Sequence, residues 1–217
     1  MSGATRFQDR IAQGLGAAAL RLGVAHTAYR PRGGPSPVAE SNRFLHLPAW
    51  FDPELRHARL LPGWAGLCWS GVFDCAYTKP GDYLVGQSAT FFVASQEPLQ
   101  PVVCVRTNRV ITVLRAPADR RPGMAQYGGK GHGPVVPFLS DWPVSLLMLS
   151  TGRRSLARLP GDGTAAQCQM LLPPLPNADL GIEATDQVVD DRGISYVVDA
   201  VEETSLGWRV ALRIATS

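Results

Sequence analysis

The sequence lacks an apolar run long enough to cross a membrane as a helix. Such a span needs about 20 consecutive apolar residues, and Arg21 interrupts the short Ala- and Leu-rich segment 14–22. The N-terminus also lacks the apolar core and flanking regions of a signal peptide. We therefore expect the protein to act in the cytoplasm where it is made, or in a structure assembled there.

Motifs of catalysis and of nucleotide binding are missing as well. Ser70 lies in Trp69-Ser70-Gly71 rather than in the GxSxG of a nucleophile elbow. The Gly-rich segment 128–133 lacks the spacing of a phosphate-binding P-loop, and no GxGxxG follows a predicted strand. We predict no catalytic and no cofactor-binding residues, and we expect that the protein is not an enzyme.

The four histidines are scattered along the chain. His46 and His57 lie 11 residues apart near Asp52 and Glu54, and they would form a metal site only if the fold brought them together. His132 lies in the Gly-rich segment, for which contact with a partner is the favoured interpretation. We predict no bound metal.

Pairs of adjacent charged residues are the remaining candidates for chemistry. The acidic pairs 190–191 and 202–203 fall beside predicted turns, so we interpret them as solvated carboxylates. The arginine pairs 120–121 and 153–154 could meet phosphates. They have no aromatic residues between them, so base stacking is not indicated and we favour solvated or inter-subunit ion pairs.

None of the four cysteines belongs to a CxxC pair, which disfavours a zinc knuckle or a redox centre. We predict buried, reduced thiols, with disulfides inside the chain or between copies as the alternative. The residues concerned are Cys68, Cys75, Cys104 and Cys168.

Charge is unevenly distributed. Residues 1–160 carry 18 basic and 9 acidic side chains, a net +9, whereas residues 161–217 carry 3 and 9, a net −6. Copies of such a chain can attract one another head to tail, or its ends can meet partners of opposite sign. Ordinary surface variation is the alternative interpretation.

Glycine and proline are what the sequence has in abundance, with 22 and 18 of 217 residues. This composition argues against a mostly helical protein and for short strands joined by many turns. One helix is predicted over 4–23, because its apolar residues recur at a spacing of three to four and form one stripe that needs a partner surface. The stripe consists of Phe7, Ile11, Leu15, Ala18 and Leu22.

The predicted fold is mainly β with this N-terminal helix, built as small β-barrel or sandwich modules with long Pro/Gly-rich arms and loops. Residues 1–63 are expected to form the helix and an extended arm. Residues 64–160 are expected to form a β module with a long loop at 116–137. Residues 161–217 are expected to form an acidic β-hairpin module, or to complete one barrel with 64–160.

Strand patterns support this division. β-branched residues flank Thr107-Asn108, which predicts a hairpin or a bulged strand over 102–114. Further strands are predicted at 144–149, 166–172, 187–189, 194–201 and 207–215.

An internal similarity links the two β regions. Segments 81–85 and 90–93 match segments 185–189 and 194–197 at a constant offset of 104. Both copies read as an Asp, a short apolar strand, a polar turn, and a strand with an aromatic residue and Val. The Asp carboxylate can hold the entry turn. The copies are either a convergent hairpin solution or two related β modules.

The C-terminal copy also resembles a known family. With its Asp, apolar strand, Gly turn, Tyr196-Val197 strand and final strand at 206–212, it is similar to the β-barrel core of tailed-phage head-completion proteins, the head–tail connectors or stoppers. Segments 79–85, 90–96 and 101–110 resemble uncharacterised proteins found among phage structural genes.

The resemblance implies a ring-forming virion protein of the head–tail neck, without catalytic residues, assembled in the host bacterial cytoplasm. Its implied partners are its own copies and the portal or adaptor, tail-terminator or tube proteins, with passing contact to DNA in a lumen and none to membrane. A tail-terminator or baseplate protein is the alternative. A phage-encoded hydrolase, using His57, His132, Asp74 or Cys104, is the second alternative.

Overall fold

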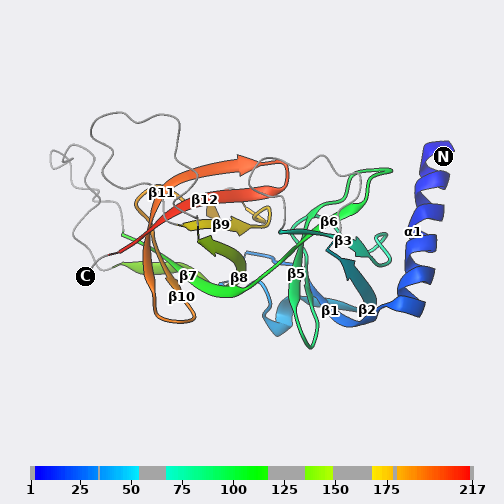
Figure 1. The fold of residues 1–217 in the computed structure, drawn as a ribbon, viewed down its shortest axis with the longest axis horizontal. Helices are drawn as coiled ribbons and strands as arrows, with labels where there is room; N and C mark the ends of the chain where they lie inside the picture. The colour runs from blue at the N-terminus through cyan, green and yellow to red at the C-terminus, as the bar shows by residue number, and fades with distance from the viewer. Residues whose placement is uncertain are drawn as a thin grey trace.

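The computed structural model describes residues 3–33, 35–53, 67–116, 135–148, 168–177 and 180–215, with side chains from Phe7 onward. One helix, α1 (Gly3–Leu22), lies at one end of the long axis, and two closed β-barrels follow it in a row (Figure 1). This arrangement confirms the predicted mainly-β fold with an N-terminal helix and small barrels.

Barrel 1 contains six strands that close in the order β1-β2-β3-β6-β5-β4, with every neighbouring pair antiparallel. A short 3-10 helix, Glu40–Asn42, precedes the second strand. The strands are β1 (Val24–Tyr29), β2 (Arg43–Asp52), β3 (Cys68–Val72), β4 (Tyr83–Val85), β5 (Thr90–Ser95) and β6 (Val102–Arg106).

Barrel 2 follows the same path, because its order β7-β8-β9-β12-β11-β10 repeats that of barrel 1 strand for strand. The chain therefore contains one β topology twice in tandem. The strands are β7 (Arg109–Arg115), β8 (Val136–Met148), β9 (Cys168–Leu172), β10 (Gln187–Asp190), β11 (Ser195–Thr204) and β12 (Gly207–Ile214).

Strand register gives the residue correspondence between the barrels. Side chains alternate between the two faces of a strand, and most inward positions in both barrels are buried and apolar. The matching interior pairs are Ala28 and Val113, Leu84 and Val188, Phe91 and Tyr196, Val93 and Val198, and Cys104 and Leu212.

Both barrels also carry a β-bulge at the same place. The register of β5 shifts between Val93 and Ser95, and that of β11 shifts between Val198 and Ala200. A bulge bends and twists its strand, which helps a short sheet to curve into a closed barrel.

The constant offset predicted for the repeat is wrong beyond the first strand. Val85 faces Thr90 across the turn of barrel 1, but Val189 faces Ser195 in barrel 2, so the second turn is one residue longer. The offset is therefore 104 before the turn and 105 after it.

Two other expectations are corrected by the topology. Much of the region expected to be an extended arm forms β1 and β2, because barrel 1 needs both strands to close. The strands on either side of Thr107-Asn108 do not form a hairpin, since β6 pairs with β3 and β5 while β7 pairs with β8 and β10. Thr107 and Asn108 instead connect the barrels, which places the module boundary there rather than near residue 161.

The helix packs on barrel 1 mainly through small residues, together with Leu15 of the predicted stripe. Ala12 and Ala19 are buried, and a side-chain carbon added at Gly16 would lie 3.2 Å from Cβ of Asp74. By contrast, Phe7 and Leu22 of the predicted stripe are 56% and 62% exposed. The buried face is therefore turned about a quarter turn from the apolar stripe.

One of the two hydrophobic clusters spans both barrels, whereas the interior of barrel 1 forms the other. Phe92 and Val103 on the outside of barrel 1 belong to the same buried cluster as the interior of barrel 2. Tyr83 lies edge-on to Trp142, with ring centroids 6.3 Å apart, and its hydroxyl donates to the carbonyl of Pro143 at 2.9 Å. The Trp142 indole donates to the carbonyl of Pro35 at 2.8 Å. These contacts fix the barrels against each other.

Candidate functional site

The most distinctive polar contact in barrel 1 is a clasp between Arg30 and Asp82. Asp82 precedes β4 and Arg30 follows β1, and the guanidinium donates from Nε at 2.8 Å and from Nη2 at 2.7 Å to the two carboxylate oxygens. The carboxylate side chain is fully buried. Its Oδ2 also accepts from the backbone N–H of Lys79 at 2.9 Å, so it holds the entry turn of β4.

Barrel 2 repeats this clasp with Arg115 and Asp186. The guanidinium donates from Nε at 3.0 Å and from Nη2 at 2.7 Å, and Asp186 Oδ2 accepts from the backbone N–H of Glu183 at 2.8 Å. Asp82 and Asp186 are the acidic residues that anchor the repeat in the sequence, and their predicted role in holding the turn is confirmed.

A phenylalanine completes each clasp. The Arg30 guanidinium carbon lies 4.5 Å from the ring centre of Phe44, and that of Arg115 lies 4.4 Å from the ring centre of Phe138. Hydrogen bonding to Asp82 and Asp186 raises the pKa of both arginines. Each charge is neutralised inside the barrel wall, so the clasps join β1 to β4 and β7 to β10 rather than receive a ligand.

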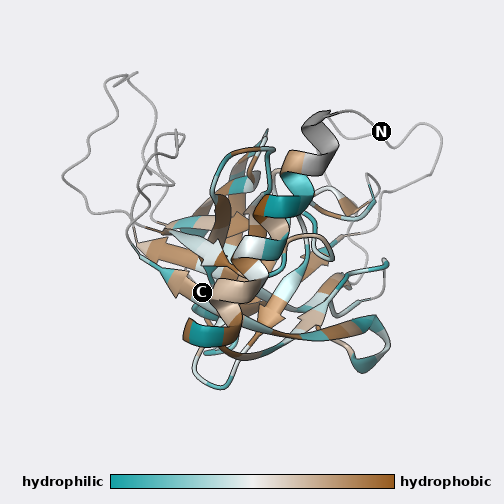
Figure 2. Cartoon of the chain, turned by 90° about the vertical axis from the view of Figure 1, so that its right-hand side faces the viewer, coloured by the Kyte–Doolittle hydropathy of each residue, from teal (hydrophilic) through white to brown (hydrophobic). Residues whose placement is uncertain are grey.

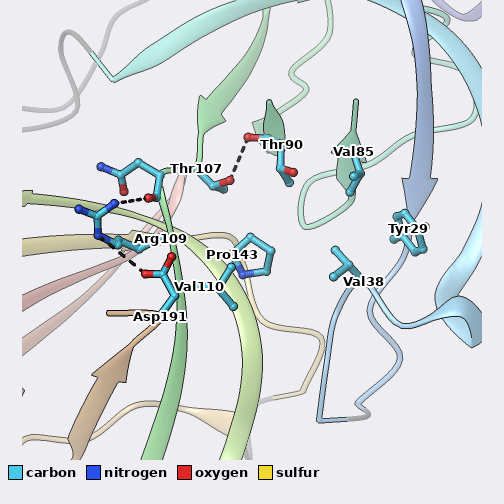
Figure 3. A pocket seen from close by; sticks show the side chains of 10 residues that line it. Tyr29, Val38, Val85, Thr90, Thr107, Arg109, Val110, Pro143 and Asp191 are labelled. Atoms are coloured by element: carbon cyan, nitrogen blue, oxygen red, sulfur yellow. Dashed lines mark hydrogen bonds and ion pairs between the residues drawn. The ribbon is translucent and has the colours of Figure 1, made fainter. Parts of the chain in front are cut away.

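An open cavity of about 410 Å³ lies where the two barrels meet (Figure 3). Tyr29, Val38 and Val85 of barrel 1 face Val110 and Pro143 of barrel 2 across it. The connecting residues line it as well, and the Thr107 hydroxyl donates to the Thr90 carbonyl at 3.0 Å. The cavity marks the barrel junction.

The charged residues on the cavity wall already have partners. Nε of Arg109 lies 3.8 Å from a carboxylate oxygen of Asp190 and 3.9 Å from one of Asp191, and its Nη1 donates to the Asn108 carbonyl at 2.7 Å. These contacts tie the connection to the β10–β11 turn. The cavity wall is therefore braced by its own ion pairs.

The expectation that Asp190 is merely solvated is wrong. Its Oδ1 accepts from the backbone N–H groups of Arg192 and Ile194 at 3.0 and 2.8 Å, and its Oδ2 accepts from the Tyr196 hydroxyl at 3.2 Å. Burial, helped by the carboxylate, raises the pKa of Tyr196 to about 12. Asp190 therefore holds the β10–β11 turn, which is one residue longer than the equivalent turn of barrel 1.

The other acidic pair forms a surface contact. Glu202 is half-exposed and pairs with Arg209 across β11 and β12, and Glu203 is exposed. His46 is exposed on β2, where its Nδ1 lies 3.1 Å from the Thr27 hydroxyl. In the part of the chain that the structure describes, His, Cys, Asp and Glu nowhere gather in a group of three that could hold a metal.

All four cysteines are buried and unpaired, as predicted. Burial raises the pKa of each thiol, to about 12 for Cys68, so the reactive thiolate is disfavoured. Cys104, a candidate nucleophile in the hydrolase alternative, lies fully buried inside barrel 1. Its position there is that of a core residue.

Several sequence candidates lie outside the described residues. These are Glu54, His57, the arginine pairs 120–121 and 153–154, Lys130, His132 and most of the predicted loop 116–137. Among the described helices, none is long and apolar enough to span a membrane.

Comparisons with family models, with curated proteins and with solved structures return no match to this chain. The duplicated barrel and its two clasps are therefore the features on which a functional assignment depends. Sequence reasoning found Asp82 and Asp186 through the repeat. It missed Arg30 and Arg115, whose partners lie 52 and 71 residues away.

Proposed function

We propose that this protein is a structural component of a tailed-phage or phage-like particle, a ring-forming subunit of the head–tail neck. The observation that carries the proposal is the architecture: two closed barrels of one topology stand in a row behind a helix whose apolar stripe is partly uncovered. The resemblance of 186–212 to head-completion barrels points in the same direction.

The use of polar groups supports a scaffold role. The buried carboxylates of Asp82, Asp186 and Asp190 hold turns and brace arginines. A ring subunit needs this kind of rigid, internally satisfied module, because each copy must present the same surface to its neighbour.

The hydrolase alternative has less support. Cys104 is enclosed by barrel 1, and Asp74 accepts a hydrogen bond from the backbone N–H of Ala76 at 3.1 Å while lying against Gly16 of the helix. Both residues serve the fold of barrel 1. A tail-terminator or baseplate subunit would use the same architecture, so the position of the protein in a particle separates those alternatives from the neck.

The proposal is tested on particles purified from the bacterium that carries the gene. An antibody to this protein, visualised with gold in the electron microscope, should label the head–tail junction, and an antibody to the major capsid protein serves as the control. Quantitative mass spectrometry should find several copies in each particle. Label at the tail tip supports the baseplate alternative instead, and absence of the protein from particles overturns the structural assignment.

A further inference from the structure

The contact between α1 and barrel 1 is made mostly of small residues. Ala12 and Ala19, two helical turns apart, are buried, and Leu15 between them is half-buried against the interior of barrel 1. Gly16 approaches Asp74 on the same side of the helix. Hydrophobic stabilisation scales with the apolar area that is buried, and small side chains bury little. This contact therefore holds α1 weakly compared with the cores that hold the barrels.

The larger apolar residues of α1 add little to its docking. Phe7, Leu20 and Leu22 are all more than half exposed. Viewed from its own end of the molecule, α1 lies in front of barrel 1 and outside both barrels (Figure 2). Gly14 and Gly16 also lower the stability of the helix relative to alanine at these positions. The helix is therefore weak both in its contact and in its own helical propensity.

The C-terminal end of α1 is fixed more firmly. The backbone N–H of Gly23 donates to the Ala19 carbonyl at 2.8 Å. A side-chain carbon added at Gly23 would lie 2.8 Å from the carbonyl carbon of Ala49 on β2, so the two backbones are in direct contact. Val24 then pairs with Ala49 as the first residue of β1. The chain is held to barrel 1 from Gly23 onward, which makes this residue the pivot for any movement of α1.

A buried thiol lies beside the contact of α1 with barrel 1. Cys75 directly follows Asp74, the residue that Gly16 approaches, and it belongs to the same buried cluster as Ala12. Cys104 is in this cluster too, but it lies on β6 inside the closed barrel. We therefore expect a thiol reagent to reach Cys75 when α1 leaves its site, and to reach Cys104 only when the barrel itself opens.

We propose that α1 is a detachable arm, which leaves barrel 1 about the pivot at Gly23 while both barrels stay folded. Proteins open locally at elements that have few buried apolar contacts. The strands of a closed barrel, by contrast, are hydrogen-bonded to a neighbour on each side. A 20-residue helix is marginal on its own in water, so the detached arm also loses its helical structure. This inference concerns the chain alone and is independent of a place in a phage particle.

Thiol labelling of the folded, full-length chain with N-ethylmaleimide tests the proposal, with each cysteine quantified by mass spectrometry of its peptide. In the wild type, Cys75 should be labelled at least about tenfold faster than Cys104. Cys68 and Cys168 should be labelled as slowly as Cys104, because both lie in the cluster that spans the barrels. Hydrogen exchange should show the amides of 8–20 exchanging ahead of those of β5 and β6.

Two neighbouring helix positions provide matched variants. Ala19 is buried against barrel 1, whereas Leu20 is 75% exposed. Ala19→Glu should speed the labelling of Cys75 by at least about tenfold and leave Cys104 and the urea unfolding midpoint of the barrels unchanged. Leu20→Glu should leave the Cys75 rate unchanged. Gly14→Ala should slow it by about threefold or more, because the added carbon meets nothing within 4 Å and favours the helix.

Equal labelling rates of Cys75 and Cys104 in the wild type would overturn the proposal, because the opening would then be global. So would an Ala19→Glu chain that fails to fold or has a lower barrel midpoint, since α1 would then belong to the cooperative unit of barrel 1. Equal Cys75 rates in Ala19→Glu and Leu20→Glu, or no change in Gly14→Ala, would show that Cys75 is reached without movement of α1 and would also refute it.

Discussion

Barrel 1 and barrel 2 have the same strand topology and differ in the side chains that pack inside them. Both have the same strand order, the same bulge and the same arginine–aspartate clasp. Inside barrel 1, Phe51 stacks on Phe91 at 3.7 Å and lies edge-on to His26 at 5.3 Å. At the positions of Phe91 and His26, barrel 2 has Tyr196 and Ile111. The common features are those that close the barrel, whereas the packing inside it can vary.

One cross-strand pair illustrates this difference in interior packing. In barrel 1, His26 lies opposite Gly86, where an added side-chain carbon would come within 2.5 Å of the imidazole Nε2. In barrel 2, the equivalent pair is Ile111 and Asp190, and the aspartate has room to fold back on its own turn. The first strand of each barrel therefore carries the larger residue of the pair, and only barrel 2 has a side chain at the position opposite it.

The largest effect is expected from breaking either clasp. Asp82→Ala and Asp186→Ala should each lower the free energy of unfolding by about 3 to 5 kcal/mol, because each leaves a half-buried guanidinium and a backbone N–H without the carboxylate. Urea denaturation measures the loss. Glu40→Ala, which removes an exposed ion pair with Arg43, should cost less than about 1 kcal/mol. A clear inequality between the two aspartates would contradict the equivalence of the barrels.

The second prediction concerns the His26–Gly86 pair. Gly86→Ala should destabilise the protein by about 1 to 3 kcal/mol, because the new methyl group overlaps the buried imidazole. In a His26→Ile background, which copies barrel 2, the same change should cost clearly less. The four proteins form a double-mutant cycle measured by urea denaturation. Additive losses would mean that the two positions do not compensate each other.

The third prediction tests how the barrels are held together. Tyr83→Phe should cost about 1 to 2 kcal/mol, because the buried carbonyl of Pro143 loses its hydrogen-bond donor. Tyr77→Phe is the control, since Tyr77 is 61% exposed and should change stability little. Thermal unfolding followed by circular dichroism measures both. Equal effects of the two substitutions would argue against a rigid junction at Tyr83.

The smallest effect is expected at Thr185. This residue has φ of +74°, and the equivalent residue before the other clasp aspartate is Gly81, with φ of +96°. Thr185→Gly should therefore stabilise the protein by up to about 1 kcal/mol, because glycine adopts this conformation without strain. Ser195→Gly, at an ordinary strand position, should instead destabilise it slightly. Denaturation midpoints that move the same way in both variants would contradict this account of the turn.

Local patterns in the sequence predicted much of the fold. The helix, five of the later strands and the turn-holding role of Asp82 and Asp186 follow from periodicity and from the repeat. β1 and β2 were not predicted, because their stretch of chain holds a Pro-rich connection and Pro48 interrupts the alternation within β2. Their strand character depends on closing a barrel with segments further along the chain.

Contacts between residues far apart in the chain had no signal in the local sequence. The extra residue in the second turn becomes visible only in the strand register. The packing face of α1 was predicted only in part. Leu15 of the predicted stripe packs against the core of barrel 1, but close approach to Asp74 selects a small residue at Gly16, which lies outside the stripe. The pairing of Arg30 and Arg115 with their aspartates likewise depends on the closed barrel. Such contacts are set by topology, which a single sequence leaves open.

Electron cryo-microscopy of the head–tail neck in purified particles tests the central proposal most directly. We expect a ring in which every subunit fits this fold, with two adjacent small barrels. A neck reconstruction whose densities are all occupied by other chains, with no pair of six-stranded barrels, would contradict it.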